Sequence, residues 1–307
     1  MKSLLIAIVC LLAIHACASN WFEGKSVLVT GGCQGIGYST AMKFAQSGAM
    51  VTIVCRNSTK GRAAENKINQ HPLVRKASGR VVYFQADIKD PLQADAMVDF
   101  AVSRFGTLDI AVNNAGISGH MAPIDEIPVS NFFSEHDALY NNIYGTMFSI
   151  AAEIRYWKRI NKEGCIVNTA SGNGHSGTPL GSMYGTSKWA VVSLTKSAAL
   201  ENMVATDTTP YIRVNAISPG LVSTPFTFNQ YWYFQGKQPY EGDYDILSPD
   251  DPNWLSIKDA WVEQLPMKRI SEPEEQADGV LFLCSPAASY MSGAVINPDG
   301  GSAANRA

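Results

Sequence analysis

The sequence lacks the marks of several protein classes. Its 24 basic residues are scattered and outnumbered by 27 acidic ones, so no nucleic-acid-binding surface is expected. There is no Cys-x-x-Cys pair, no Cys/His cluster and no His-Glu-x-x-His motif, and we therefore predict no metal site. A Gly-x-Ser-x-Gly motif is also missing, which argues against serine-hydrolase chemistry. No repeat, low-complexity tract or linker divides the chain, which favours one domain.

The N-terminus has the pattern of a secretory signal peptide. Lys2 gives a positive start, Leu4–Ile14 is an uncharged apolar run, and Ala16-Cys17-Ala18 has the small-x-small form of a cleavage site. The apolar run is shorter than the roughly 20 residues that span a bilayer, so we expect no stable membrane span. We predict that residues 1–18 are removed, that residues 19–307 form the mature domain, and that the protein enters the secretory pathway, either secreted or in the endoplasmic reticulum lumen. An uncleaved N-terminal membrane anchor is the alternative.

Cysteine is sparse after this leader, and the four positions, Cys33, Cys55, Cys165 and Cys284, are far apart. Such positions are not typical of a disulfide framework, although a secretory route would expose them to an oxidising compartment. Cys33 and Cys55 follow two strands that we expect to be neighbours, so a bond between them is the alternative to four buried or free thiols. We favour the free thiols.

Short apolar runs then alternate with longer helix-like segments. The runs are continuous and rich in β-branched residues, such as Val51-Thr52-Ile53-Val54, which is typical of strands buried on both faces. The predicted strands are Ser26–Thr30, Val51–Val54, Val81–Gln85, Ile110–Asn113, Cys165–Asn168, Ile212–Ile217 and Ala294–Ile296. The predicted helices are residues 36–47, 59–69, 92–105, one helix within 130–158, then 182–204 and 274–284. This order predicts an α/β fold with a doubly wound parallel sheet of about seven strands, and ligands at the carboxyl ends of the strands.

Residues 226–265 break this alternation. Aromatic side chains are frequent from Phe226 to Tyr244, and acidic residues lie between Asp243 and Asp251. We interpret the segment as an excursion that covers the ligand site, because long irregular segments in compact domains are commonly functional. Aromatic residues that form core or an oligomer contact are the alternative.

A glycine-rich turn, Thr30-Gly31-Gly32-Cys33-Gln34-Gly35-Ile36-Gly37, follows the first strand and opens the first helix. Its glycines accept backbone angles that other residues resist, and they let the main chain approach a pyrophosphate. The start of the helix adds unsatisfied N–H groups and a partial positive charge. The turn therefore predicts a dinucleotide site at Gly31, Gly35, Ile36 and Gly37, with a plain glycine turn as the alternative.

Four further motifs follow in order: Asn113-Asn114-Ala115-Gly116, Tyr184-x-x-x-Lys188, Arg213–Gly220 and Asp299-Gly300-Gly301. With the Gly-x-x-x-Gly-x-Gly spacing of the turn, they resemble the short-chain dehydrogenase/reductase family over residues 21–303. The resemblance implies a Rossmann-type fold in a single domain, a nicotinamide dinucleotide cofactor, and interconversion of carbonyls and alcohols. It also implies a homo-oligomer, a dimer or a tetramer.

The end of the second strand bears on the choice of cofactor. An acidic residue there would pair with the ribose hydroxyls of NAD and repel the 2′-phosphate of NADP. This chain instead has Cys55 followed by Arg56, whose guanidinium can pair with a phosphate. We therefore predict NADP(H) rather than NAD(H), with a solvated surface arginine as the alternative.

The family resemblance assigns three more cofactor contacts. Asp87, after the third strand, corresponds to the residue that bonds the adenine ring, although a helix cap is the alternative for it. Asn114 would lie against the nucleoside. Thr224 would bond the nicotinamide amide.

Tyr184 and Lys188 are four residues apart near the start of a predicted helix, so they share one face. Hydride transfer needs a partner that moves a proton to or from the substrate oxygen. A free tyrosine has a pKa of about 10, which suits this role poorly near neutrality. We expect the Lys188 ammonium and the helix N-terminus to lower the pKa of Tyr184. In the family this lysine also holds the nicotinamide ribose.

The resemblance completes the catalytic group with two more residues. Ser171 would bond the substrate oxygen, and Asn142 would hold a water in a proton relay with Lys188. The neighbouring Asn141 is the alternative for that role. His175 lies four residues beyond Ser171, and we interpret it as a loop-facing polar residue, with substrate contact as the alternative.

These residues predict an NADP(H)-dependent oxidoreductase that interconverts a carbonyl and an alcohol. The aromatic excursion favours an apolar small-molecule substrate, such as a steroid, a retinoid, a fatty-acyl chain or an aromatic ketone. The alternative is a dinucleotide-binding regulatory or scaffold protein with little turnover. The intact set of Ser171, Tyr184 and Lys188 argues against that alternative.

Overall fold

A computed structural model describes residues 21–134, 137–204, 206, 210–234, 259 and 261–304. The predicted leader, residues 1–18, and residues 235–258 of the aromatic excursion lie outside the described residues. No helix in the described part of the chain is long and apolar enough to cross a membrane.

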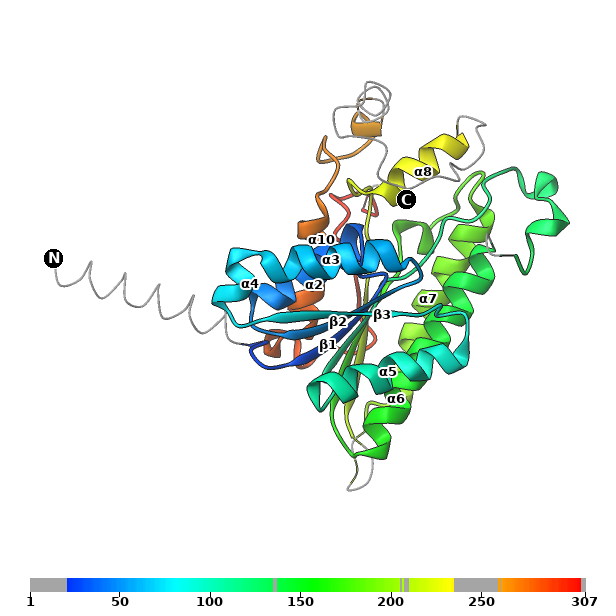
Figure 1. Ribbon diagram of the computed structural model, residues 1–307. Coiled ribbons are helices and arrows are strands. Elements are labelled where there is room, and N and C mark those ends of the chain that lie inside the picture. Colours follow the sequence, from blue (N-terminus) through cyan, green and yellow to red (C-terminus); the bar gives the residue numbers. More distant parts are fainter. Residues whose placement is uncertain are drawn as a thin grey trace.

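Seven parallel strands form one sheet in the order β3-β2-β1-β4-β5-β6-β7, seen at the centre of Figure 1. The strands are β1 (Ser26–Thr30), β2 (Met50–Cys55), β3 (Arg80–Gln85), β4 (Ile110–Asn113), β5 (Gly164–Thr169), β6 (Ile212–Ile217) and β7 (Val295–Ile296). Strand β1 pairs with β2 on one side and with β4 on the other. The order of strands therefore reverses beside β1, and ligands of such sheets bind in the crevice outside the carboxyl ends of the strands at this point.

Helices cover both faces of the sheet, with α2, α3, α4 and α10 on one side and α5, α6 and α7 on the other (Figure 1). The α-helices are α2 (Gly35–Gln46), α3 (Ser58–Gln70), α4 (Pro72–Lys76), α5 (Pro91–Phe105), α6 (Gly145–Arg159), α7 (Ser182–Glu201), α8 (Pro225–Phe234) and α10 (Pro273–Cys284). In β1, Val27 and Val29 join the core cluster under α2 and α10, whereas Leu28 joins the cluster under α5 and α6. The strand is buried on both faces, which confirms the interpretation of its uninterrupted apolar sequence.

The predicted fold class is confirmed, and the differences from the predicted elements are local. Three predicted strands, those at Ser26, Ile110 and Ile212, have the observed bounds. The short helix α4 was not predicted; His71 caps it by accepting a hydrogen bond from Leu73 N, and Pro72 occupies its first turn. The helix expected within residues 130–158 begins as a π-helical turn, Tyr140–Tyr144, before α6.

The favoured prediction of four free thiols is wrong for Cys33 and Cys55, which form a disulfide with their Cα atoms 6.3 Å apart. The reason lies in the register of the sheet, because Thr30 at the end of β1 pairs with Val54 next to the end of β2. The glycine-rich turn then folds back, and Gly31 N donates a hydrogen bond to Val54 O at 2.8 Å. Cys165 and Cys284 are free and buried, as predicted.

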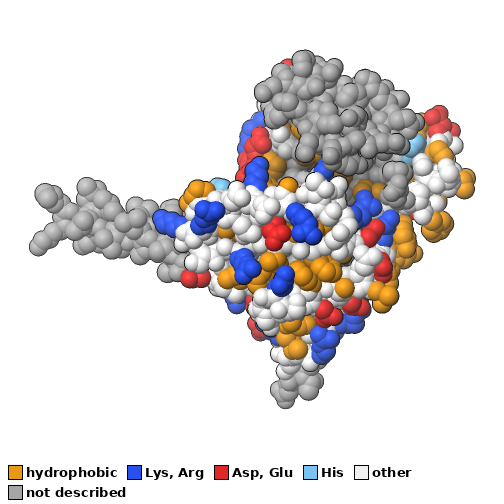
Figure 2. Space-filling view, viewed as in Figure 1, with side chains coloured by type: hydrophobic (Ala, Val, Ile, Leu, Met, Phe, Trp, Pro, Cys, Tyr) orange, Lys and Arg blue, Asp and Glu red, His pale blue; other side chains and the backbone are white. Residues whose placement is uncertain are grey.

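The surface of the loop between β4 and α6 is unusually apolar. Ile124, Val129 and Phe133 are 76%, 85% and 87% exposed. In Figure 2 apolar side chains gather along the right-hand margin, where this loop lies in Figure 1. The same loop contributes Met121 to the main cavity of the molecule.

Candidate active site

A cavity of about 810 Å³ lies at the carboxyl ends of the strands and joins most of the predicted cofactor and catalytic residues, although Gly37, Asp87 and Asn142 are not in its lining. Its nucleotide side is lined by the glycine-rich turn and by the end of β2. Its other side is lined by the residues after β5, the start of α7 and the segment after β6. The cavity lining includes Gly31, Gly35, Ile36, Arg56, Asn114, Ser171, Tyr184, Lys188 and Thr224.

The glycine-rich turn leaves no room for side chains. Gly31 and Gly35 have positive φ angles of 64° and 53°, a conformation that favours glycine. A Cβ at Gly37 would lie 2.3 Å from Gly31 O, and one at Gly31 would lie 2.9 Å from the Asn114 amide nitrogen. Helix α2 begins at Gly35, so its first N–H groups lie beside this turn. The residues present therefore fit a dinucleotide, because the pyrophosphate needs close backbone approach and unsatisfied N–H donors.

Arg56 lies at the mouth of the cavity with a side chain that is 51% exposed. Its guanidinium is 3.8 Å from the Asp87 carboxylate, and Lys89 is 3.7 Å from the same carboxylate. The backbone at this point is held by Gln85, which donates a hydrogen bond to Arg56 O at 2.9 Å. The positive charge is thus fixed next to the strand end while the side chain remains able to meet a phosphate.

Asp87 is not a helix cap. The cap of α5 is Asp90, whose carboxylate accepts a hydrogen bond from Leu92 N at 2.9 Å. Asp87 instead accepts one from Lys89 N at 3.0 Å, within the turn that follows β3. The alternative interpretation of Asp87 is therefore wrong, and its adenine contact stays a prediction.

Asn114 and Thr224 both lie against the glycine-rich turn. Asn114 N donates to Thr30 Oγ1 at 3.1 Å, which ties the end of β4 to the end of β1. Thr224 is buried and lies over Gly35, where a Cβ would be 3.2 Å from Thr224 Cγ2. Both residues therefore line the cavity beside the glycines that would meet the cofactor.

Tyr184 and Lys188 are both buried, on consecutive turns at the start of α7. The Lys188 ammonium donates a hydrogen bond to Thr169 O at 2.8 Å and lies 5.7 Å from the centre of the Tyr184 ring. Ser171 follows β5, and its hydroxyl is hydrogen-bonded with Tyr184. The three side chains predicted to perform catalysis are thus brought together.

Asn142 rather than Asn141 reaches this group. Its side chain is fully buried, accepts a hydrogen bond from Ile117 N, and donates to Ile117 O and Ser187 Oγ, each at 2.9 Å. Asn141 donates instead to Asp137 O within its own helix. The π-helical turn is what places Asn142 inward, and such turns are frequent at functional sites.

Asn142 also lies close to Lys188. A Cβ built on Gly116 would be 3.1 Å from Asn142 Oδ1 and 3.4 Å from Lys188 Nζ. Gly116, the last residue of the Asn-Asn-Ala-Gly motif, therefore leaves the space between the two side chains open. The relay role of Asn142 stays a prediction that this proximity favours.

The expected lowering of the Tyr184 pKa is wrong for this arrangement. Burial raises the pKa of Tyr184 to about 12, and the hydrogen bond with Ser171 opposes this only in part. Burial also lowers the pKa of Lys188 to about 8. Desolvation acts on both side chains because each is almost fully buried by protein atoms, and it outweighs the attraction on which the sequence argument relied.

The sequence did not identify Phe226 as a neighbour of the catalytic tyrosine. Its ring packs against the Tyr184 ring with the ring centres 5.6 Å apart and the planes tilted by 47°. Phe226 opens α8 and lines the cavity, as does Trp261 further along the chain. Phe228 packs with Trp261 and Ile270 in a small apolar cluster beside the cavity. The described parts of the aromatic excursion therefore serve both as cavity wall and as local core.

His175 lies near the site but outside the described cavity lining. Its ring is 6.3 Å from the Trp189 ring on α7. Burial and the charge of Lys196 lower its pKa, with Asp299 opposing. The placement is consistent with the preferred interpretation of His175 as a loop residue.

Comparison with known proteins bears on this geometry. The model of the short chain dehydrogenase family matches residues 25–231, and a model described as enoyl-(acyl carrier protein) reductase matches residues 250–303. The chain belongs to the short-chain dehydrogenase/reductase family. It is therefore an oxidoreductase of the kind that acts on CH–OH groups.

Relatives of known activity match nearly the full chain. A 2,5-dichloro-2,5-cyclohexadiene-1,4-diol dehydrogenase of Sphingobium indicum is 33% identical, over 91% of this chain and 97% of its own length. A solved levodione reductase has a TM-score of 0.79 at 30% identity, covering 92% of this chain and 99% of that protein. The 3-ketoacyl-(acyl-carrier-protein) reductase of Brucella melitensis, solved in complex with NADH, has a TM-score of 0.73 at 28% identity, covering 92% and 99%.

Proposed function

We propose that this oxidoreductase uses NADP(H) to interconvert a carbonyl and an alcohol on an apolar small molecule. The observation that carries the proposal is that one cavity joins the glycine-rich turn, Arg56 and the buried Ser171, Tyr184 and Lys188. The turn fits a dinucleotide, and the buried trio supplies the proton chemistry that hydride transfer requires.

The proposed roles of the catalytic residues follow from which side chains hold a proton at neutral pH. When bound, the nicotinamide supplies or accepts the hydride. Ser171 holds the substrate oxygen by a hydrogen bond, and Tyr184 gives that oxygen a proton during reduction. A pKa of about 12 keeps the Tyr184 phenol protonated at neutral pH, which suits it as a proton donor. Lys188 and Asn142, on the inner side of the site, then pass a proton back to Tyr184.

NADP(H) is proposed over NAD(H) because of Arg56. Strand β2 ends in Cys55, and a basic residue follows it where an NAD-binding site would use a carboxylate. The guanidinium of Arg56 is half exposed beside the cavity and can pair with a 2′-phosphate. Because the Brucella relative was solved in complex with NADH, NADP(H) and NAD(H) must be compared directly.

An apolar substrate is proposed because of the cavity wall. Phe226, Trp261, Leu221 and Met121 line the cavity, and the Phe226 ring packs against Tyr184. The ring diol in the name of the Sphingobium relative adds alicyclic carbonyls to the steroids, retinoids, fatty-acyl chains and aromatic ketones expected from the sequence. These compounds share a carbonyl or hydroxyl group on an apolar carbon skeleton.

The secretory route is proposed on two grounds. The leader-like residues 1–18 are one, and the Cys33–Cys55 disulfide is the other, because disulfides persist in oxidising compartments. Self-association as a dimer or tetramer also belongs to the proposal, on the family resemblance alone. Gel filtration of the purified protein tests it, and a monomer at micromolar concentration would contradict it.

The test is a panel of cyclic, steroidal, fatty-acyl and aromatic ketones and alcohols, assayed by nicotinamide absorbance with NADP(H), with NAD(H) and without cofactor. We expect turnover that is at least tenfold more efficient with NADP(H), a ratio that one charge-assisted phosphate contact can supply. Equal or better use of NAD(H) would refute the cofactor assignment. Binding of NADPH without turnover of any compound would favour the regulatory alternative.

A further inference from the structure

We propose that the Cys33–Cys55 disulfide is a positioning element of the cofactor site, and that its reduction weakens NADP(H) binding. The inference rests on the proposed function, because it concerns the same cofactor. The two half-buried cysteines both line the cavity, together with the residues that would hold the dinucleotide. The bond therefore lies within the site and is reachable by a small thiol.

The disulfide joins the two halves of the predicted phosphate site. On one side, Cys33 precedes Gln34 and Gly35, where α2 begins and the pyrophosphate would lie. On the other side, Cys55 is the last residue of β2 and directly precedes Arg56, which would meet the 2′-phosphate. A single covalent bond across 22 residues of chain therefore fixes the distance between these two anion sites.

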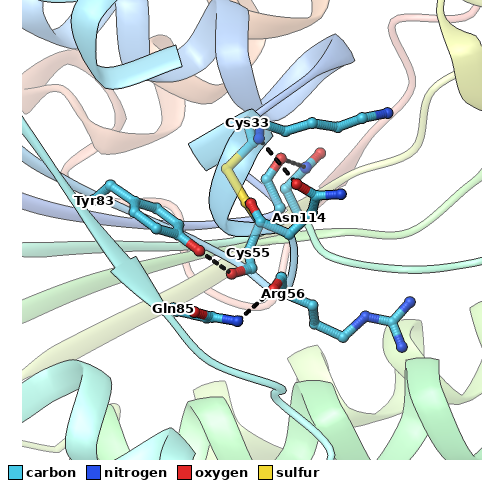
Figure 3. Close-up of a disulfide and its surroundings, with 9 residues drawn as sticks. Cys33, Cys55, Arg56, Tyr83, Gln85 and Asn114 are labelled. Atoms are coloured by element: carbon cyan, nitrogen blue, oxygen red, sulfur yellow. Dashed lines mark hydrogen bonds between the residues drawn. A yellow bond between two sulfur atoms is a disulfide. The ribbon is translucent and has the colours of Figure 1, made fainter. Parts of the chain in front are cut away.

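The two partners of the bond are held very differently by the rest of the protein. Figure 3 shows Tyr83 and Gln85, both on β3, reaching the end of β2. The Tyr83 hydroxyl donates to Cys55 O at 3.1 Å, and the Gln85 amide donates to Arg56 O at 2.9 Å. Cys55 is therefore anchored with or without the disulfide.

Cys33, in contrast, lies in a turn that is glycine at four of its seven positions from Gly31 to Gly37. Gly31 N and Gly32 N donate to Val54 O at 2.8 and 3.3 Å, which fixes the backbone up to the residue before Cys33, and Cys33 itself packs partly against the core cluster under α2. Glycine-rich backbone loses more conformational entropy on ordering than other sequences do. The disulfide restricts the turn before the cofactor binds, so less conformational entropy is lost on binding.

Reduction is a balanced exchange with a dithiol such as dithiothreitol. The Cys33–Cys55 S–S bond breaks, each sulfur takes one proton and one electron, and the dithiol is oxidised to its own disulfide. Both thiols stay in the cavity. The turn then keeps its backbone hydrogen bonds to Val54 but loses its covalent tie to the end of β2.

The test measures the affinity of the full-length protein for NADPH and for adenosine 2′,5′-bisphosphate, with and without dithiothreitol. We expect about tenfold weaker binding of both after reduction, because one freed residue of backbone is worth roughly that factor. In kinetics, KM for NADPH should rise by the same factor, whereas kcat at saturating NADPH should stay within about twofold. A disulfide that only stabilised the fold would leave KM unchanged in protein that remains folded.

Variants separate the bond from other effects of the reductant. The double variant Cys33→Ser/Cys55→Ser should bind NADPH as weakly as the reduced wild type, and dithiothreitol should not change its affinity. Cys284→Ala, which removes a buried free thiol, should keep the full response. Circular dichroism confirms that each form is folded at the assay temperature.

Linkage supplies a reciprocal measurement that does not depend on any variant. Saturating NADP⁺ should shift the thiol–disulfide equilibrium toward the disulfide by the same factor of about ten. Affinities that are equal in the two redox states, or tighter after reduction, would overturn the inference and leave the proposed function intact. Failure of the oxidised wild type to bind NADPH would overturn the proposed function and the inference with it.

Discussion

The catalytic end and the adenosine end of the cavity differ in how far their functional side chains are exposed to solvent. Tyr184 and Lys188 are 6% and 4% exposed and are held by hydrogen bonds to Ser171 and to the backbone of β5. Arg56 is half exposed, and its nearest charged partner, Asp87, is 3.8 Å away. The side chains of the first end are buried and fixed by the protein itself, whereas the second end keeps a charge available at the surface.

The difference explains which properties each end controls. Burial moves the pKa values of Tyr184 and Lys188 in opposite directions and so sets proton transfer. At the adenosine end, water screens the charge of the half-exposed Arg56, and Lys60 also lines the cavity, so recognition depends on these two charges and on the geometry of the turn. We therefore expect changes at the catalytic end to alter the rate of the reaction and changes at the adenosine end to alter affinity for the cofactor.

The largest expected effect is that of Tyr184→Phe on turnover. The variant lacks the hydroxyl that gives the substrate oxygen its proton, so kcat should fall about 10²- to 10⁴-fold. Affinity for NADPH, measured by fluorescence titration, should change less than about threefold. Tyr144→Phe, which removes a hydroxyl from an exposed tyrosine, is the matched control and should retain activity. If the affinity for NADPH fell by as much as kcat, Tyr184 would control cofactor binding as well as the reaction rate. This would contradict the distinction between the two ends of the cavity.

The disulfide should have the next largest effect, on stability. Closing a loop of 22 residues stabilises a fold by about 3 kcal/mol in the chain-entropy model. Urea unfolding of the Cys33→Ser/Cys55→Ser variant should show a loss of this size relative to the oxidised wild type. A loss below about 1 kcal/mol would mean that the turn is already fixed without the bond.

Arg56→Asp sharpens the comparison at the adenosine end. A carboxylate there should repel the 2′-phosphate and weaken NADPH binding about 10- to 100-fold, the value of a charge-assisted hydrogen bond. The affinity for NADH should rise, because the carboxylate can accept from the ribose hydroxyls. Steady-state kinetics with both cofactors should show changes in KM at nearly constant kcat. Arg62→Gln, on the neighbouring helix α3, is the charge-loss control, and an unchanged NADPH:NADH preference in Arg56→Asp would contradict the assignment.

The last prediction concerns a buried carboxyl outside the cavity lining, and it is measured as stability rather than as activity. Glu153 on α6 is fully buried, accepts a hydrogen bond from the Asn113 amide at 3.1 Å, and burial raises its pKa to about 8. Because the unfolded chain releases this proton near pH 4.5, the folded state binds more protons between these two values. The stabilisation from Glu153 is thus complete below pH 4.5 and is lost as pH rises through 8.

Glu153→Gln should remove this dependence by keeping a neutral amide at the same place. Relative to the wild type, the variant should gain stability progressively from about pH 5 to pH 9, by up to a few kcal/mol. Urea midpoints measured across this range for both proteins provide the comparison. A difference that does not change with pH would show that Glu153 is ionised in the folded protein.

The sequence predicted the fold and the placement of the catalytic residues well, because both follow from local patterns. Runs of β-branched residues identified the strands, and the four-residue spacing of Tyr184 and Lys188 placed both on one face of α7, a single turn apart. The sequence also predicted that the turn after β1 needs glycines. At Gly37 the structure shows the reason, because a Cβ there would lie 2.3 Å from Gly31 O.

What the sequence could not predict depends on distances between separate elements. The Cys33–Cys55 bond needs the register of β1 against β2 and the fold-back of the turn. The contact of Phe226 with Tyr184 joins α8 to α7, and no local pattern specifies it. The direction of the Tyr184 pKa depends on how completely the site excludes water, which only packing determines.

The most direct measurement follows the hydride itself. The wild-type protein would be incubated with an accepted ketone and with NADPH that carries deuterium at the hydride-donating carbon of the nicotinamide. We predict that mass spectrometry of the product alcohol finds one deuterium on the carbinol carbon, and that Tyr184→Phe forms almost none of this alcohol. An alcohol without deuterium, or one formed equally well by Tyr184→Phe, would contradict hydride transfer assisted by Tyr184.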